Sequence, residues 1–167
     1  LEALEEKLKS RRFAAFIVEP IQSEAGVRVP HDDYLKEAET LCRRYGTLFV
    51  LDEVQTGIYR TGPFLAAHHW GLDPDMVILA KALSGGFYPV SAFLASDQVM
   101  DVFTPGIHGS TYGGNPLGCA VAGAALDVLV EEKLVERTAE LGAYFKAKLE
   151  GLKTDKVKEV RCIGLWA

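Results

Sequence analysis

The chain has 167 residues, of which 49% are hydrophobic and 25% are charged, a composition typical of one globular domain with a buried core. A net charge of -5 and the lack of any Lys/Arg-rich block argue against nucleic-acid binding. No apolar run is long enough to span a bilayer, and the 3 scattered cysteines fit neither a disulfide framework nor a zinc site.

The first part of the chain predicts a helix, a strand and a second helix. Residues 1–8 carry leucines at helical spacing and predict a short amphipathic helix. The continuous apolar run 13–18 predicts a buried strand. Asp32 or Asp33 is then expected to cap a helix that ends before Gly46, with its apolar side chains on one face.

Three more strands are expected at residues 47–51, 76–80 and 90–95. The first two are apolar throughout, and segments with helical periodicity separate some of the strands. Strands of this kind are typical of a parallel sheet that is buried on both sides. We therefore expect an α/β fold, with a mostly parallel sheet and helices on both faces.

The second part of the chain is expected to be mainly helical. Asn115 followed by Pro116 is a strong helix start, and the apolar pattern continues to about Leu129. A further helix is expected over about 135–149, and residues 159–166 resemble the start of a strand. Both ends of the chain fall within such elements, so we expect a piece of a longer protein.

Polar side chains follow the predicted strands where each strand ends. They are Glu19, Asp52, Glu53 and Lys81. In parallel sheets the chemistry lies outside the carboxyl ends of the strands, so Asp52 and Lys81 are expected at one edge. An amine can form a Schiff base with pyridoxal phosphate, and a carboxylate can hold the ring nitrogen protonated. A plain salt bridge at the sheet edge is the alternative reading of the same pair.

Four motifs together resemble signatures of the class III (omega) aminotransferases of fold type I. They occur in the order typical of that family and cover nearly the whole chain. The motifs are Val18-Glu19-Pro20-Ile21-Gln22-Ser23-Glu24-Ala25-Gly26, Leu51-Asp52-Glu53-Val54-Gln55-Thr56-Gly57, Leu79-Ala80-Lys81-Ala82-Leu83-Ser84-Gly85-Gly86 and His108-Gly109-Ser110-Thr111-Tyr112-Gly113-Gly114-Asn115-Pro116-Leu117-Gly118. Within the family, the run Phe87-Tyr88-Pro89-Val90-Ser91-Ala92 is most similar to the ornithine aminotransferases. Ser23 departs from the glycine that the family often has there.

The resemblance implies a role for each matching residue. Lys81 would form the internal aldimine with pyridoxal 5'-phosphate and later move the substrate proton. Asp52 would pair with the ring nitrogen, Val54 would pack on one face of the ring, and Gln55 would hydrogen-bond the phenolic oxygen.

Two further parts of the resemblance concern the neighbouring subunit and the second substrate. Thr111, together with Ser110, would reach the cofactor phosphate of the neighbouring subunit in a homodimer. Glu24 matches a glutamate that pairs with an active-site arginine and moves aside for the second substrate. That arginine does not occur among these residues.

The implied reaction is a ping-pong transamination. An omega-amino substrate such as ornithine would give its amine to the cofactor, which would pass it to a 2-oxo acid such as 2-oxoglutarate. Acetylornithine or another omega-amino acid is the alternative donor. Residues 1–150 would be part of the cofactor-binding large domain, and 151–167 would begin the small domain. We expect a cytoplasmic protein, or a mitochondrial matrix protein if a transit peptide lies upstream, and little activity from these residues alone.

Two other readings of the sequence lead to different chemistry. The strand before Asp52-Glu53 also resembles a Walker B strand, whose aspartate would hold magnesium in a P-loop ATPase. That reading needs a G-x-x-x-x-G-K-[ST] loop, and Pro63-Phe64 follows the glycine spacing instead. The neighbouring His68 and His69 would point apart on a regular element, so we expect no metal site.

Overall fold

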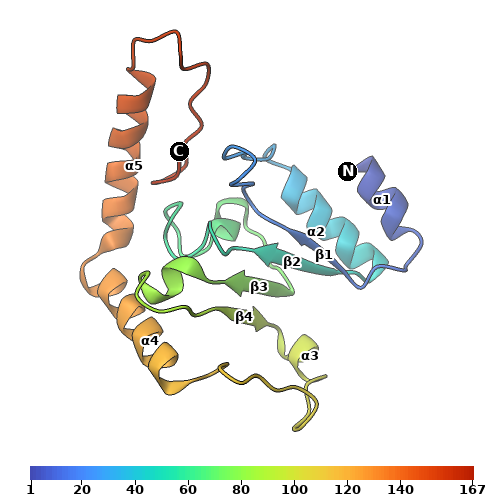
Figure 1. Ribbon diagram of the computed structural model, residues 1–167. Helices are drawn as coiled ribbons and strands as arrows, with labels where there is room; N and C mark the ends of the chain where they lie inside the picture. Colours follow the sequence, from blue (N-terminus) through green and yellow to red (C-terminus); the bar gives the residue numbers. More distant parts are fainter.

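The computed structural model describes residues 1–167. Its elements follow the predicted alternation in the first part of the chain and are helical in the second (Figure 1). Their bounds are α1 (Glu2–Leu8), β1 (Ala15–Val18), α2 (Tyr34–Tyr45), β2 (Leu48–Asp52), the 3-10 turn η1 (Ala66–Trp70), β3 (Met76–Leu79), the 3-10 turn η2 (Lys81–Ser84), β4 (Ala92–Ala95), α3 (Asp97–Met100), α4 (Pro116–Glu131) and α5 (Leu134–Glu150).

The strands form one sheet in the order β1-β2-β3-β4. β1, β2 and β3 are parallel, and β4 joins the edge antiparallel to β3. The α/β class and the mostly parallel sheet are therefore confirmed. Since parallel neighbours end at the same edge, the segments that follow β1, β2 and β3 all begin on one side of the sheet.

Two apolar clusters form the core, and both lie on one face of the sheet. In the first, α1, α2 and η1 cover Phe49 and Leu51 of β2. In the second, η2 and α4 cover Val77 and Leu79 of β3. Leu51 is paired in register with Val77, and paired residues point to the same face, so the two clusters lie next to each other on it.

The opposite face of the sheet carries apolar side chains without a covering helix. Alternate residues of the strands point to this face, among them Ile17, Val50, Ile78 and Phe93. None of these belongs to either core cluster, and Ile17 and Phe93 are 61% and 43% exposed, although Val50 between them is only 2% exposed. Within residues 1–167 the helices thus cover one face of the sheet rather than the two that the apolar strands predict.

The ends of two helices illustrate how local sequence sets their bounds. α2 ends where Gly46 adopts a left-handed conformation at φ 71°, as predicted. Asp33 occupies the expected N-cap position, but its side chain makes no capping hydrogen bond. At α4, by contrast, the Asn115 side chain accepts a hydrogen bond from the Gly118 N–H at 2.7 Å, as a cap residue should.

The last residues do not form the predicted strand at 159–166. They contain one isolated bridge between Ile163 and Trp166, formed by a turn at Gly164. The prediction was wrong because these residues pair with other segments: the Arg161 Nε donates to the Gly26 carbonyl and the Leu165 N–H to the Arg60 carbonyl.

α5 extends away from the sheet, and the C-terminal segment returns alongside it (Figure 1). The contact between them is close, because a Cβ added to Gly142 of α5 would lie 2.5 Å from the Gly164 carbonyl oxygen. None of the helices is long and apolar enough to cross a membrane.

Candidate active site

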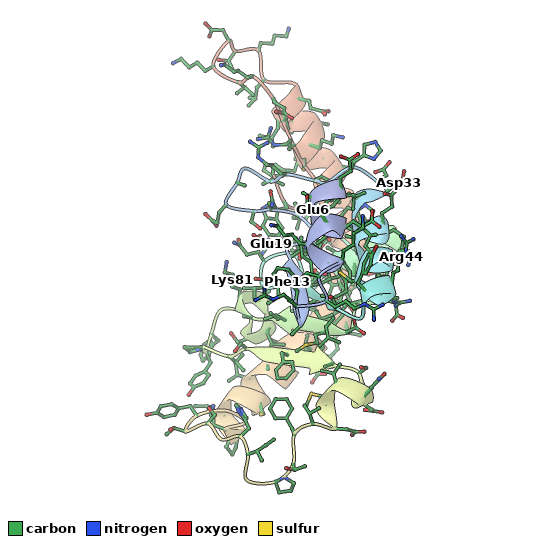
Figure 2. The ribbon with its side chains drawn as sticks, turned by 90° about the vertical axis from the view of Figure 1, so that its right-hand side faces the viewer. Glu6, Phe13, Glu19, Asp33, Arg44 and Lys81 are labelled. Carbon is green, nitrogen blue, oxygen red and sulfur yellow. The ribbon has the colours of Figure 1, made fainter.

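The carboxyl ends of the parallel strands bring Asp52 and Lys81 to one edge of the sheet. Asp52 is the last residue of β2 and is paired in register with Ile78 of β3, three residues before Lys81. Glu19 follows β1 at the same edge. Figure 2 shows Lys81 and Glu19 on one side of the molecule and Arg44 and Asp33 on the other. The strand-end rule thus correctly predicts that Asp52 and Lys81 lie at the same edge of the sheet.

Lys81 is held at an abrupt corner between β3 and η2. Its φ is 45°, a left-handed conformation that lysine rarely adopts and that costs roughly 1–3 kcal/mol. The residue is exposed, and its amine makes no hydrogen bond or ion pair. Strained backbone of this kind clusters at functional sites. The Lys81 amine at this corner therefore has no partner within the protein.

Asp52 has one carboxylate oxygen engaged and one without a partner. The Val54 N–H donates to Asp52 Oδ1 at 3.0 Å, which fixes the orientation of the half-buried carboxylate. No protein group hydrogen-bonds the other oxygen. A carboxylate arranged this way can accept a hydrogen bond from a protonated ring nitrogen.

An open cavity lies between this edge of the sheet and the second-half helices. Lys81, Val54 and Gln55 line it together, with apolar side chains of α4, α5 and the C-terminal turn completing the wall, whereas Asp52 lies outside its lining. Most of the lining is hydrophobic with a few polar groups, as is usual in small-molecule sites.

Glu24 joins this site through Gln55. The Gln55 Nε2 donates to Glu24 Oε1 at 3.2 Å, although 31 positions separate the two residues. Glu19, by contrast, turns to its own loop, where its Oε2 accepts from both the N–H and the hydroxyl of Ser23 at 3.2 Å. Glu24 therefore lies beside the cavity residues, whereas Glu19 orders the loop after β1.

Ser110 and Thr111 lie apart from this group. Both are exposed in the segment between α3 and α4, and neither lines the cavity beside Lys81. The Ser110 hydroxyl accepts a hydrogen bond from the Gly113 N–H at 2.9 Å, which shapes the turn before α4. Within one chain, therefore, the structure does not bring these two residues to Lys81.

One residue at a predicted strand end has a role there that the sequence does not predict. Glu53 is only 1% exposed, and its carboxylate accepts hydrogen bonds from Thr56 Oγ1, Ala66 N–H and Ala67 N–H. The available signal is strand alternation, by which Glu53 must point to the opposite face from Asp52. Because both its oxygens are engaged inside the protein, Glu53 does not suit the Walker B reading.

The residues present suit pyridoxal phosphate. An unpaired amine can attach to the aldehyde, and a carboxylate with an unpartnered oxygen can hold the ring nitrogen. Val54 offers an apolar surface beside them and Gln55 an amide. No cluster of side chains in residues 1–167 could hold a metal ion.

Known proteins that are similar to this chain belong to one family. Residues 1–167 match the Aminotransferase class-III family. The chain is 57% identical over 167 residues to an ornithine aminotransferase of Plasmodium falciparum, covering 99% of this chain and 40% of that protein. It is 56% identical over 165 residues to the mitochondrial ornithine aminotransferase of Drosophila melanogaster, covering 99% of this chain and 38% of that protein. The chain thus spans about 40% of the length of these relatives.

Solved structures of similar proteins share the fold. An ornithine aminotransferase of Toxoplasma gondii, with partial occupancy of PLP at its active site, superposes with a TM-score of 0.93 at 53% identity, covering 98% of this chain and 39% of that one. An acetylornithine aminotransferase of Elizabethkingia anophelis superposes with a TM-score of 0.92 at 57% identity, covering 98% and 42%. The chain therefore belongs to the class III aminotransferases, a family of pyridoxal-phosphate enzymes.

Proposed function

We propose that the protein containing this chain transfers the omega-amino group of ornithine to a 2-oxo acid such as 2-oxoglutarate in a ping-pong reaction. The observation that carries the proposal is the pair at the sheet edge, the unengaged amine of Lys81 and the Asp52 carboxylate with its unpartnered oxygen. Membership of the class III aminotransferases and the similarity to ornithine aminotransferases support it.

Each site residue has a proposed task. Pyridoxal phosphate, when bound, supplies an aldehyde that exchanges amines and a ring that withdraws electrons from the substrate carbon. Lys81 attaches the cofactor and, when released, carries a proton to and from the carbon that bears the substrate amine. Asp52 keeps the ring nitrogen protonated. Val54 packs against the ring and Gln55 hydrogen-bonds its phenolic oxygen.

Glu24 is proposed to act in the choice between the two substrates. Its carboxylate can attract a cationic group, and its hydrogen bond to Gln55 ties its position to the cofactor site. A carboxylate beside the cavity favours a substrate that carries an additional positive charge, as ornithine does. A 2-oxo acid substrate would require this carboxylate to be neutralised or displaced, because like charges repel.

Ser110 and Thr111 are proposed to act across a homodimer interface. They lie in an exposed segment with hydroxyls suited to a phosphate, and apolar Tyr112 and Ile107 beside them are 78% and 62% exposed. A second subunit covering this segment would bury Tyr112 and Ile107. The hydroxyls of Ser110 and Thr111 would then hydrogen-bond the phosphate of the cofactor bound by that second subunit. Residues 1–150 would then be part of the cofactor-binding domain, and 151–167 the beginning of a second one.

An acetylornithine aminotransferase is the second candidate, because one such structure is 57% identical to the chain. The two activities differ in whether the donor's alpha amine is free or acetylated. The Phe87-Tyr88-Pro89 run after the glycine pair favours ornithine. We place the protein in the cytoplasm, with the mitochondrial matrix as the alternative, since the fruit-fly relative is mitochondrial.

The test begins with the cofactor. Adding pyridoxal phosphate should produce the visible absorbance band of a Schiff base, Lys81→Ala should abolish it, and Lys7→Ala on α1 should leave it unchanged. Adding ornithine should bleach the band faster than adding acetylornithine does. Magnesium-dependent nucleotide binding without the band would refute the proposal in favour of an ATPase. We expect residues 1–167 alone to have little transaminase activity, and turnover comparable to that of a full-length enzyme would contradict this.

A further inference from the structure

Glu53 lies directly beside the proposed cofactor residues but faces the protein interior. It follows Asp52, and its N–H continues the sheet by donating to the Ile78 carbonyl at 3.0 Å. Successive residues of a strand point to opposite faces, so Asp52 and Glu53 cannot move independently. A backbone that is held in place at Glu53 therefore also holds the backbone of Asp52.

The Glu53 carboxylate joins both ends of one loop. On the outgoing side it accepts from Thr56 Oγ1 at 2.5 Å, and on the returning side from Ala66 N–H at 3.0 Å and Ala67 N–H at 2.8 Å. It forms no salt bridge, so these three donors are the partners that its buried oxygens have. A buried carboxylate satisfied by hydrogen bonds is a strong constraint on the groups that donate them.

The loop that Glu53 closes holds the cofactor candidates Val54 and Gln55 and is strained. Ile58 and Tyr59 adopt φ values of 57° and 63°, which are unfavourable for such residues and above all for β-branched Ile58. Strain of this kind persists only where surrounding contacts hold the backbone in place. The Glu53 carboxylate ties both ends of this loop together, and it does so beside two other contacts, the Gly57 N–H to the Glu53 carbonyl and His69 Nε2 to Thr61.

We propose that Glu53 is a positioning residue of the cofactor site, whose buried carboxylate fixes the 54–67 loop and so holds Asp52, Val54 and Gln55 in place. This inference rests on the proposed function, because it assigns those three residues to pyridoxal phosphate. Glu53 itself does not contact the cofactor. Its loss acts first on the order of the loop and, through the loop, on cofactor affinity.

The experiment compares two buried carboxylates. Glu53→Gln retains the size of the side chain but sets an amide donor against backbone N–H donors. Glu39→Gln is the matched control: Glu39 is 2% exposed, and its carboxylate pairs with Lys36 and Arg43 on α2, away from the loop. Thr56→Val is a milder variant that removes one donor and keeps the shape, and it provides the test if Glu53→Gln does not fold.

Three quantities are measured for each variant: the dissociation constant of pyridoxal phosphate, amide hydrogen exchange over residues 54–67, and the unfolding midpoint. Glu53→Gln should weaken cofactor binding by about tenfold or more and speed exchange in the loop. Thr56→Val should act in the same direction by a smaller factor. Glu39→Gln should lower the midpoint without changing cofactor affinity or loop exchange.

Two results would overturn the inference. If Glu53→Gln and Glu39→Gln change cofactor affinity equally, or neither changes it, Glu53 has only a structural role. If the unsubstituted protein gives no Lys81-dependent band with pyridoxal phosphate, the proposed function fails and the positioning role fails with it. If the unsubstituted protein binds the cofactor and Glu53→Gln binds it equally tightly, the positioning role alone is refuted and the proposed function stands.

Discussion

The contact between α5 and the C-terminal turn depends on two glycines, and Gly142→Ala tests it. An alanine Cβ at this position would lie 2.5 Å from the Gly164 carbonyl oxygen and 2.7 Å from its carbon. The turn cannot retreat freely, because the backbone of Thr61 lies behind it, 2.6 Å from where a Cβ on Gly164 would be. Relief therefore requires α5 itself to shift, and α5 lines the cavity beside Lys81.

The magnitude follows from two opposing terms. Crowding in a packed region costs about 1–3 kcal/mol, and we take about 2–3 kcal/mol here because the opposing atoms are backbone. Replacing glycine by alanine within a helix stabilises the folded state by about 1 kcal/mol. Gly142→Ala should therefore lower the free energy of unfolding by roughly 1–2 kcal/mol.

Gly123→Ala in α4 provides the matched control, since a Cβ there meets nothing within 4 Å. It should gain the same helix propensity without crowding and stabilise the protein by about 1 kcal/mol. The difference between the two variants isolates the crowding cost and corresponds to roughly 4–12 °C in thermal midpoint for a chain of this size. Thermal unfolding followed by circular dichroism measures it. Equal midpoints for the two variants would refute the close contact between α5 and Gly164.

Two further predictions concern a buried thiol and the Gln55–Glu24 contact. Burial, and then the charge of Asp75, raise the pKa of the Cys42 thiol from 9.0 to about 11, so thiol reagents at mild pH should label exposed Cys119 and spare Cys42. Because unfolded Cys42 ionises first, stability should fall as the pH rises from 9.0 to about 11, and Cys42→Ala should flatten that fall. Gln55→Glu sets a carboxylate against Glu24 and should weaken cofactor binding by charge repulsion. Added salt screens that repulsion, so the affinity of Gln55→Glu relative to the unsubstituted protein should recover with salt, whereas the affinity of Gln55→Met should not.

The regular elements were predictable because their signals are local. The apolar runs that form β1, β2 and β3 appear in the sequence without reference to any partner. Helical spacing alone predicts the apolar α2 face, and four of its five residues are buried while the fifth, Tyr45, is partly buried; the four are Leu35, Ala38, Leu41 and Cys42. The ends of elements depend more on context, as the unused side chain at the Asp33 cap position shows.

The predicted strand at 159–166 failed for a reason that no local pattern reveals. Its alternation of apolar and polar residues is compatible with a strand, but its hydrogen-bonding partners are the Gly26 and Arg60 carbonyls, about 100 or more positions away. Gly164 then turns the chain at φ 57° against Thr61. Tertiary contacts of this range override a short apolar pattern.

The candidate site also has a part that the sequence predicts and a part that it does not. Asp52 and Lys81 could be placed at one sheet edge because parallel strands end together. The contact of Gln55 with Glu24 and the network around Glu53 could not, because each joins loops whose paths the sequence pattern does not determine. Strand alternation indicates that Glu53 faces inward but does not identify the donors that meet it there.

The face of the sheet that no helix covers is apolar, as if it were also meant to be buried. Strands exposed on one side usually alternate apolar with polar residues, yet β1 and β2 are apolar on both sides. Ile17 and Phe93 are 61% and 43% exposed where a buried strand would have them covered. Exposed apolar surface of this kind favours association. The strands thus carry the composition of a sheet enclosed between two layers, while residues 1–167 supply one layer. The proposed cofactor site depends on the same arrangement, because Asp52 points to the uncovered face and Glu53 to the covered one.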